Sequence, residues 1–168
     1  MFAIKPLSRD AIPGALAKAE RYRLLNEPGE AESICLDVLQ IDPGHQDALV
    51  MLVLALTDQF REELPSSRSA PARAADLVAG LTDPYDRFYY AGIIRERRAK
   101  AILHRDRYAS TATAAEWLRE AMGLFERAET IRPAHNDDAV LRWNACARLL
   151  QHLPEPQPES RDEPIQLE

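Results

Sequence analysis

Cationic side chains are concentrated in one stretch of this chain, residues 86–107. Seven arginines and lysines stand there against three carboxylates, a local net charge of +4, whereas the whole chain carries −6. The cations are Arg87, Arg95, Arg97, Arg98, Lys100, Arg105 and Arg107. Groups of this kind at this density could bind a carboxylate or another anion. The alternative, which mixed charge on a helix favours, is a solvated surface with salt bridges.

Arg95 differs from the other cations because helical spacing places it on an apolar face. The same face carries Phe88 and Gly92, and we expect it to be buried. A buried guanidinium costs free energy unless a carboxylate and further acceptors meet it. We therefore predict a structural ion pair for Arg95, in preference to a ligand-binding role. The carboxylates on helices expected to be its neighbours are Asp58, Asp137 and Asp138.

The sequence shows no recognisable arrangement for catalysis or metal binding. His45 and His135 each follow a proline by two residues, where we expect a helix to start. Cys35 and Cys146 fall on apolar helical stripes, which favours buried structural thiols; an activated Cys146 thiol is the alternative. Metal-ligand spacing, a glycine-rich phosphate loop and a nucleophile elbow are missing. We predict a protein that is not an enzyme and has no metal and no cofactor.

Composition bounds the class of protein. With 168 residues, 46% of them hydrophobic, the chain can form one domain with a core. Its acidic balance, and the lack of stacking aromatics among the arginines, disfavour nucleic-acid binding. The longest apolar run, Ala48–Leu56, is far shorter than the roughly 20 residues of a membrane span. A proline interrupts the first residues before any signal-like apolar stretch, so we expect a cytoplasmic protein without a membrane partner.

Three similar stretches that end in proline punctuate the chain, at residues 39–43, 80–84 and 129–133. Proline ends a helix because it has no N–H, yet it suits the first turn of the next helix. Between these stretches, apolar residues recur at helical spacing. The pattern predicts an all-α fold of about seven helices, at residues 12–25, 30–41, 47–60, 72–81, 85–105, 114–131 and 136–153.

We expect these helices to form one domain over residues 12–153, after an N-terminal lead-in of residues 1–11. Short turns make consecutive helices antiparallel neighbours, and the last helix, 136–153, has no partner. The third helix is apolar on nearly all sides and should lie in the middle of the domain. Residues 154–168 are acidic and rich in proline, so we expect a disordered tail. The expected pairs are about 12–42, 46–82 and 85–132.

These patterns resemble tetratricopeptide repeats, in which antiparallel helix pairs form a right-handed stack. The positions that carry the resemblance are Tyr22, Ala31, Asp42 and Pro43 in the first pair, and Gly92, Ala121, Phe125, Ala128 and Pro133 in the third. The chain departs from the family in its spacing, because the prolines at 43, 84 and 133 lie 41 and 49 residues apart, against a usual period of about 34. We assign the surplus to insertions around residues 64–71 and 100–113. A non-repeat bundle of seven helices is the alternative fold.

The resemblance implies a concave groove, lined by the first helix of each pair, in which such proteins bind peptides. The groove would be apolar at its centre, with Arg97, Asn144 and Arg148 converging towards its C-terminal end. These side chains could hold a carboxylate or a peptide backbone by charge-assisted hydrogen bonds. Carried over position by position, the groove residues are Leu16, Glu20, Val50, Leu54, Asp58, Tyr89, Ile93, Arg97, Val140, Asn144 and Arg148.

From these features we predict a non-catalytic adaptor or scaffold that binds a peptide or helix of another protein in the groove. The alternative is a structural subunit that self-associates, or completes a larger assembly, through the apolar edge of the stack. A solenoid must cover the exposed flank of its last helix, and a second copy could do so. The residues expected on that flank are Trp143, Leu149 and Leu150.

Overall fold

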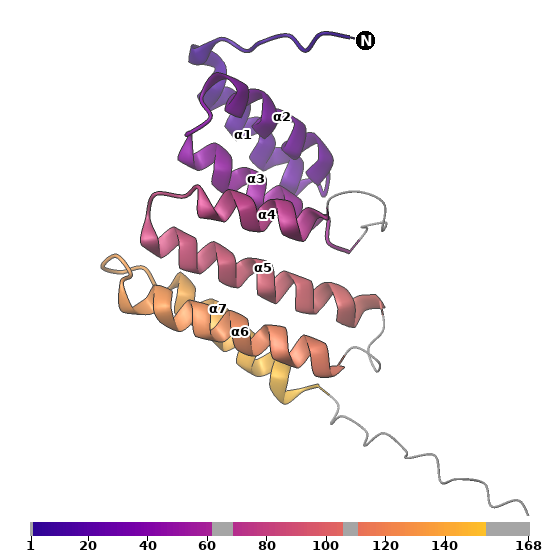
Figure 1. The fold of residues 1–168 in the computed structure, drawn as a ribbon, viewed down its shortest axis with the longest axis vertical. Coiled ribbons are helices and arrows are strands. Elements are labelled where there is room, and N and C mark those ends of the chain that lie inside the picture. Colours follow the sequence, from indigo (N-terminus) through magenta and orange to yellow (C-terminus); the bar gives the residue numbers. More distant parts are fainter. Residues whose placement is uncertain (1, 62–68, 106–110, 154–168) are drawn as a thin grey trace, which may run out of the picture.

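The computed structural model describes residues 2–61, 69–105 and 111–153, and every regular element within these ranges is a helix (Figure 1). The prediction of an all-α fold is therefore confirmed. A single turn of 3-10 helix, Arg9–Ala11, precedes the first α-helix. The α-helices are α1 (Ile12–Leu24), α2 (Pro28–Ile41), α3 (Gln46–Asp58), α4 (Ala70–Ala79), α5 (Pro84–Arg105), α6 (Thr111–Thr130) and α7 (Asp138–Gln151).

The helices form a stack in which each α-helix packs against the next one along the chain, from α1 to α7. In addition, α1 packs against α3, and α3 packs against α5. Figure 1 shows α1 and α2 at one end of this stack and α6 and α7 at the other. The odd-numbered helices α1, α3 and α5 therefore lie side by side along one face of the molecule.

Several helix boundaries differ from the sequence-based prediction, and local chemistry explains two of them. The helix α2 begins at Pro28, two residues earlier than expected, because proline fits the first position of a helix. The helix α7 begins at Asp138, two residues later than expected, because His135 takes a left-handed conformation with φ of 65°. The side-chain oxygen of Asn136 then accepts a hydrogen bond of 3.0 Å from the backbone N–H of Asp138.

The two histidines expected at helix starts behave differently. The Nδ1 atom of His45 accepts a 3.4 Å hydrogen bond from the backbone N–H of Ala48, so this residue caps α3 as predicted. His135 instead lies in the loop before α7 and is exposed. The predicted disordered tail, residues 154–168, lies outside the described residues, as do parts of the two expected insertions.

The hydrophobic core has two main parts that meet at α5. One part is built from α1 to α4 and contains Leu52 and Leu56, and the other is built from α5, α6 and α7 around Phe125. The helix α3 contributes buried side chains around most of its circumference and packs on four other helices, as its apolar sequence predicts. Ile94 of α5 belongs to the first part and Ile93 to the second, so α5 is buried on both sides.

The close packing of α5 and α6 depends on the missing side chain of Gly92. A Cβ atom at this position would lie only 2.5 Å from Cε1 of Phe125 and 2.8 Å from its Cδ1. The Phe125 ring is fully buried and has no room to move away. Gly92 is thus the residue that lets the two longest helices approach, as the sequence suggested.

Replacing Gly92 by alanine is expected to destabilise the protein by about 1–3 kcal/mol, the usual cost of overpacking a core, although alanine is the better helix former. The matched control is Gly123→Ala in α6, where a Cβ would meet nothing within 4 Å. We expect this control to stabilise by about 0.5–1 kcal/mol. Urea denaturation followed by circular dichroism measures both changes, and equal midpoints for the two variants would contradict the packing argument.

Candidate functional site

The candidate site is a pocket on the face formed by the odd-numbered helices, with a volume of about 550 Å³. Its walls come from α1, α3, α5 and α7, together with residues that directly follow α1 and α3. We call it the polar pocket. Its lining residues are Glu20, Arg23, Leu24, Asn26, Thr57, Asp58, Phe60, Arg61, Arg97, Lys100 and Arg142.

On one wall of the polar pocket, the carboxylate of Asp58 is shared by two guanidinium groups. Nε of Arg23 in α1 lies 2.8 Å from Oδ2 of Asp58, and Nη1 of Arg97 in α5 forms an ion pair with Oδ1. The Asp58 side chain is only 19% exposed, so water screens these pairs weakly. This single carboxylate therefore ties three neighbouring helices together.

Beside the polar pocket, the buried carboxylate of Glu96 is also shared by two cations. Its side chain is fully buried, and its Oε1 forms an ion pair with Lys100 one turn along α5 and lies 3.5 Å from Nη1 of Arg142 in α7. Its other oxygen, Oε2, is buried without a hydrogen-bond partner. Glu96 thus holds Lys100 and Arg142 in place at the edge of the pocket.

Arg142 is charged under all ordinary conditions. Burial lowers the pKa of its guanidinium, but the Glu96 carboxylate and a hydrogen bond with Tyr89 outweigh this and raise the pKa overall. Because the group cannot lose its proton, it offers a fixed positive charge and fixed donor directions.

The polar pocket carries an excess of positive charge. Five of its lining residues are cations and two are carboxylates, and Glu96 adds a third carboxylate behind the wall. Each of Asp58 and Glu96 balances one charge while it contacts two cations. Guanidinium groups with donors left over after such sharing can bind carboxylate oxygens of a ligand. The arrangement is therefore suited to hold an anionic group.

Only part of the groove predicted from the sequence coincides with the polar pocket. Glu20, Asp58 and Arg97 line it, whereas Arg148 is exposed elsewhere on α7. Ile93 is wrong as a contact residue, because only 1% of it is exposed. The remaining predicted residues are half-buried and lie outside the pocket: Leu16, Val50, Leu54, Tyr89, Val140 and Asn144.

Three cations of the pocket were not predicted from the sequence, and the residues expected to form an apolar centre lie outside the pocket. The missed cations are Arg23, Arg61 and Arg142, which come from three separate segments. Helical periodicity identifies the face of a helix that each one occupies, but it gives no distance between residues on different helices. The sequence did indicate part of this site, because the basic stretch 86–107 contributes Arg97 and Lys100 to the pocket.

The prediction for Arg95 is wrong. Its side chain is 39% exposed and its Nε lies 3.0 Å from Oε2 of Glu120 in α6, which is itself 42% exposed. The long helix α6 packs along α5 and brings Glu120 to this edge, so Arg95 is not buried. Asp58 is already held by Arg23 and Arg97.

The other two predicted partners of Arg95 also lie elsewhere. Oδ1 of Asp137 is 3.0 Å from Nη1 of Arg132, in the loop that joins α6 to α7. Asp138 is exposed in the first turn of α7. Both residues lie at one end of the α5–α6 pair, whereas Arg95 lies near the centre of α5. The separation is large because α5 and α6 are longer than the other helices.

Both cysteines are buried structural thiols, as predicted. Burial raises the pKa of Cys35 to about 12 and the pKa of Cys146 to about 12. Glu96 adds to the effect at Cys146 by its negative charge. The thiolate is the reactive form of cysteine, so both side chains are poorly suited to nucleophilic chemistry.

The described ranges hold neither a metal-binding group nor a membrane-spanning helix. Residues 2–61, 69–105 and 111–153 contain no group of three or more His, Cys, Asp or Glu that could hold a metal ion. In the same part of the chain, none of the helices combines the length and the apolar composition required to cross a membrane.

Comparison with known proteins gave no match to a protein-family model, a curated protein or a solved structure.

Replacing Glu96 by glutamine is expected to destabilise the protein by about 1–3 kcal/mol, because Lys100 and Arg142 lose their only carboxylate among the described residues. Both cations are 36% exposed, and water therefore limits the loss. The control is Glu120→Gln, which removes an exposed partner and should change stability by less than about 0.5 kcal/mol. Urea midpoints measure the stability of both variants. A Glu96→Gln variant as stable as its control would show that Glu96 does not hold Lys100 and Arg142 in place.

Both thiols are expected to react slowly with an aromatic disulfide reagent at pH 8 in the folded protein. A pKa raised from 9.0 to about 12 lowers the thiolate fraction about a thousandfold. In urea both should react at the rate of an ordinary cysteine. The release of the coloured thiol measures the rate, and a fast phase in the folded protein would show that one thiol is accessible and activated.

Proposed function

We propose that the protein is a non-catalytic binding module, a tetratricopeptide-like stack that holds an acidic segment of a partner protein in the polar pocket. The observation that carries the proposal is the meeting of cations from α1, α5 and α7 and the residue Arg61 around one hollow. The packing of α1 on α3 and of α3 on α5 supports the arrangement that the family resemblance implies.

The shape of the pocket favours a peptide segment over a single small anion. Its volume of about 550 Å³ accommodates several side chains, and its lining reaches from the end of α1 to α7. Leu24 and Phe60 supply apolar surface beside the charges. A segment with two or more carboxylates could therefore contact the Arg23–Arg97 side and the Lys100–Arg142 side together.

The chemistry of the pocket favours binding over catalysis. The Lys100 ammonium is held in an ion pair with the buried carboxylate of Glu96. The thiols of Cys35 and Cys146 are protonated at neutral pH because burial raises the pKa of each. Reduced, buried cysteines also suit the cytoplasm, where we propose that the interaction takes place.

The alternative of a self-associating subunit has less support. Large exposed apolar side chains come from separate segments, such as Phe2, Leu25 and Leu141. Singly exposed apolar residues are normal on a protein surface and do not by themselves form an interface. On the last helix, Trp143 donates a 2.9 Å hydrogen bond to Glu126 of α6, which fixes its ring against the stack.

The test is a fluorescence anisotropy titration of the full chain with a labelled glutamate-rich peptide. We expect Arg97→Glu and Arg61→Glu to weaken binding about tenfold or more, because each variant reverses a charge in the pocket. The matched control is Arg148→Glu, which makes the same change at an exposed position of α7 outside the pocket. Affinity should also fall as salt is raised, since the interaction is electrostatic.

Two outcomes would contradict the proposal. One is equal binding by the pocket variants and the Arg148→Glu control, with circular dichroism showing that all are folded. The other is equal affinity for a lysine-rich peptide of the same length. The test remains valid if Arg97→Glu does not fold. Arg61→Glu should not disturb folding, because Arg61 is exposed and lies beyond the end of α3.

A further inference from the structure

A further hollow lies at the first end of the stack, on the outer surface of α1 and α2. Its volume is about 540 Å³, and we call it the end hollow. Its lining comes from the segment before α1, from one face of α1 and from one face of α2. Figure 1 shows no further described helix beyond α1 and α2 at this end, so the hollow opens to solvent.

The floor of the end hollow is apolar and has free space. Ala15 and Tyr22 line it from α1 and Ile34 lines it from α2, and all three are half-buried. Gly14 adds no side chain, and a Cβ atom at this position would meet nothing within 4 Å. The hollow can therefore receive apolar side chains from outside.

Acidic groups border the end hollow. Asp10, Glu30 and Asp37 line it, together with the single cation Lys18. All four belong to residues 2–61, which the structure describes without a gap. Within the described part of the chain, none of these four side chains has an ion pair or a hydrogen bond. The border therefore has an excess of negative charge and attracts a cationic segment.

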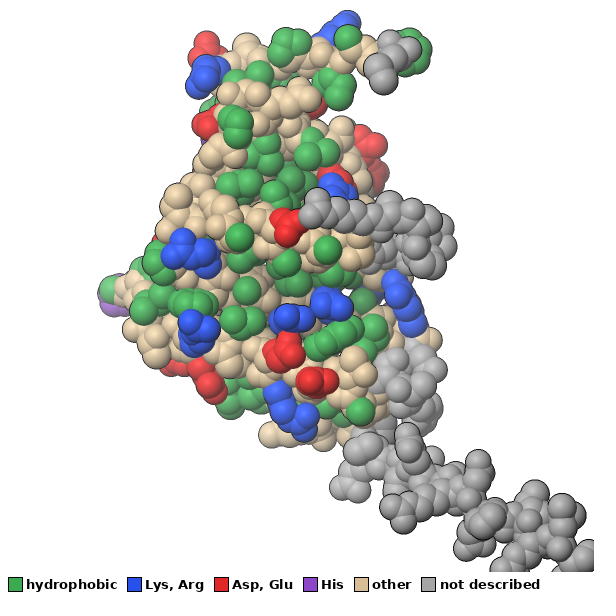
Figure 2. All heavy atoms as spheres, viewed as in Figure 1, with side chains coloured by type: hydrophobic (Ala, Val, Ile, Leu, Met, Phe, Trp, Pro, Cys, Tyr) green, Lys and Arg blue, Asp and Glu red, His purple; other side chains and the backbone are tan. Residues whose placement is uncertain are grey.

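The same chain carries a segment of complementary character. Residues 2–6 have no regular secondary structure and are exposed throughout, and we call them the N-terminal arm. Phe2 is 102% exposed and Ile4 is 68% exposed, so both apolar side chains stand largely in water. Lys5 adds a positive charge next to them. Figure 2 shows hydrophobic and cationic side chains on this segment and hydrophobic side chains on the helices beside it.

The arm points away from the end hollow of its own chain. Pro6 has a fixed φ and favours an extended conformation for the preceding residue, Lys5, which disfavours a reversal of the chain here. Leu7, the next residue, already lines the hollow. Figure 1 shows the N-terminal trace running outward from the end of the stack. The arm is thus directed towards a second molecule.

The arm and the end hollow match in length and in pattern. The lining runs along α1 from Ala11 to Tyr22, about 16 Å at 1.5 Å per residue. Five residues of extended chain span about 17 Å. In an extended segment alternate side chains face the same way, so Phe2 and Ile4 can both enter the hollow while Lys5 faces its border.

We propose that two copies of the chain form a symmetric dimer in which each N-terminal arm occupies the end hollow of the other copy. Phe2 and Ile4 pack on the apolar floor, and Lys5 meets the carboxylates of the border. The interface is isologous, so each of these contacts occurs twice.

The dimer adds to the proposed binding function and does not compete with it. Glu20 and Arg23 of α1 line the polar pocket, whereas Lys18 and Tyr22 line the end hollow. At 100° per residue the two pairs lie on different sides of α1. Each dimer therefore presents two open polar pockets, and a partner with two acidic segments would bind both.

Light scattering on the full chain, over a concentration series from about 1 μM to about 1 mM, measures the dissociation constant of the dimer. We expect Ile4→Ser to raise this constant about tenfold or more, because the lost contact occurs twice. The matched control is Leu141→Ser in α7, which removes a side chain of similar exposure, 63%, from a position outside the arm and the end hollow. This control should leave the dissociation constant unchanged.

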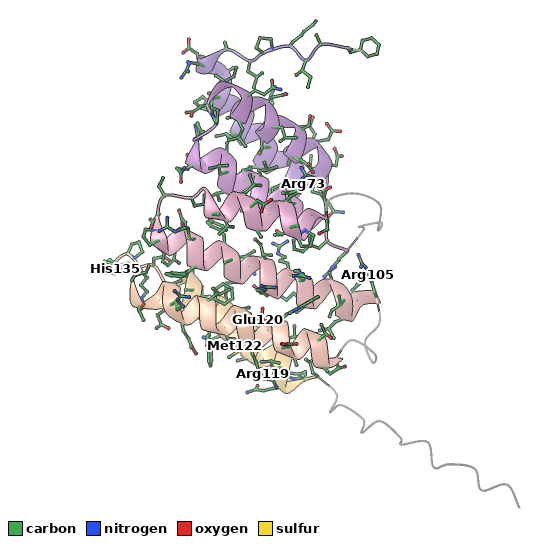
Figure 3. All side chains as sticks on the ribbon, viewed as in Figure 1. Arg73, Arg105, Arg119, Glu120, Met122 and His135 are labelled. Atoms are coloured by element: carbon green, nitrogen blue, oxygen red, sulfur yellow. The ribbon has the colours of Figure 1, made fainter. Side chains whose placement is uncertain are left out.

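Two charge-reversal variants test the pairing of arm and hollow. Lys5→Glu makes the arm acidic, and the double variant Glu30→Lys, Asp37→Lys makes the border basic. Each variant alone should dimerise about tenfold or more weakly, because like charges then meet. An equal mixture of the two should dimerise about as well as the unaltered chain, because in both contacts an arm meets a border of opposite sign. The control is Arg119→Glu at an exposed position of α6 (Figure 3), which should dimerise normally.

Three results would overturn the proposal. The first is a chain that stays monomeric over the whole concentration series, as it would if the arm served a different partner or lay on its own chain. The second is an equal effect of Ile4→Ser and Leu141→Ser on the dimer. The third is a mixture of the two charge-reversal variants that does not dimerise, although circular dichroism shows both to be folded. Ile4→Ser keeps the test decisive if the double variant does not fold, because residue 4 lies outside every helix.

Discussion

The structure depends on carboxylates that are each shared by two cations. Asp58 joins Arg23 to Arg97, and Glu96 joins Lys100 to Arg142, so two acidic groups connect four helices. Taking such charges out of water is costly, and the cost is recovered only when the partners and further hydrogen bonds are well placed. Sharing also leaves a positive excess, because each carboxylate cancels one of its two cations. The same arrangement that orients the helices thus produces the electrostatic character of the polar pocket.

The helix α5 concentrates this chemistry because it is buried on several sides at once. Gly92 faces Phe125 of α6, Glu96 faces Arg142 of α7, and Arg97 faces Asp58 of α3. A helix in this position has no large solvated face on which its cations could spread. Most of them line one of two hollows, one polar and formed by the odd-numbered helices, the other lying between α4 and α6.

The polar pocket would recognise a partner mainly by charge. Most of the free energy of binding would come from charge-assisted hydrogen bonds, which salt weakens. Buried Glu96 contributes to this recognition, because its cations Lys100 and Arg142 line the pocket.

The sequence by itself determined the helices and the local features that end, start and separate them. Proline at 84 starts α5, His45 caps α3, and the glycine at 92 marks the close contact of α5 and α6. These follow from backbone chemistry and helical periodicity, which act over a few residues. The ion pairs were decided only by the tertiary structure: Arg95 meets Glu120, and Asp58 meets Arg23 and Arg97. Periodicity fixes the side of a helix on which a residue lies, but the register and crossing of packed helices fix which residues on different helices meet.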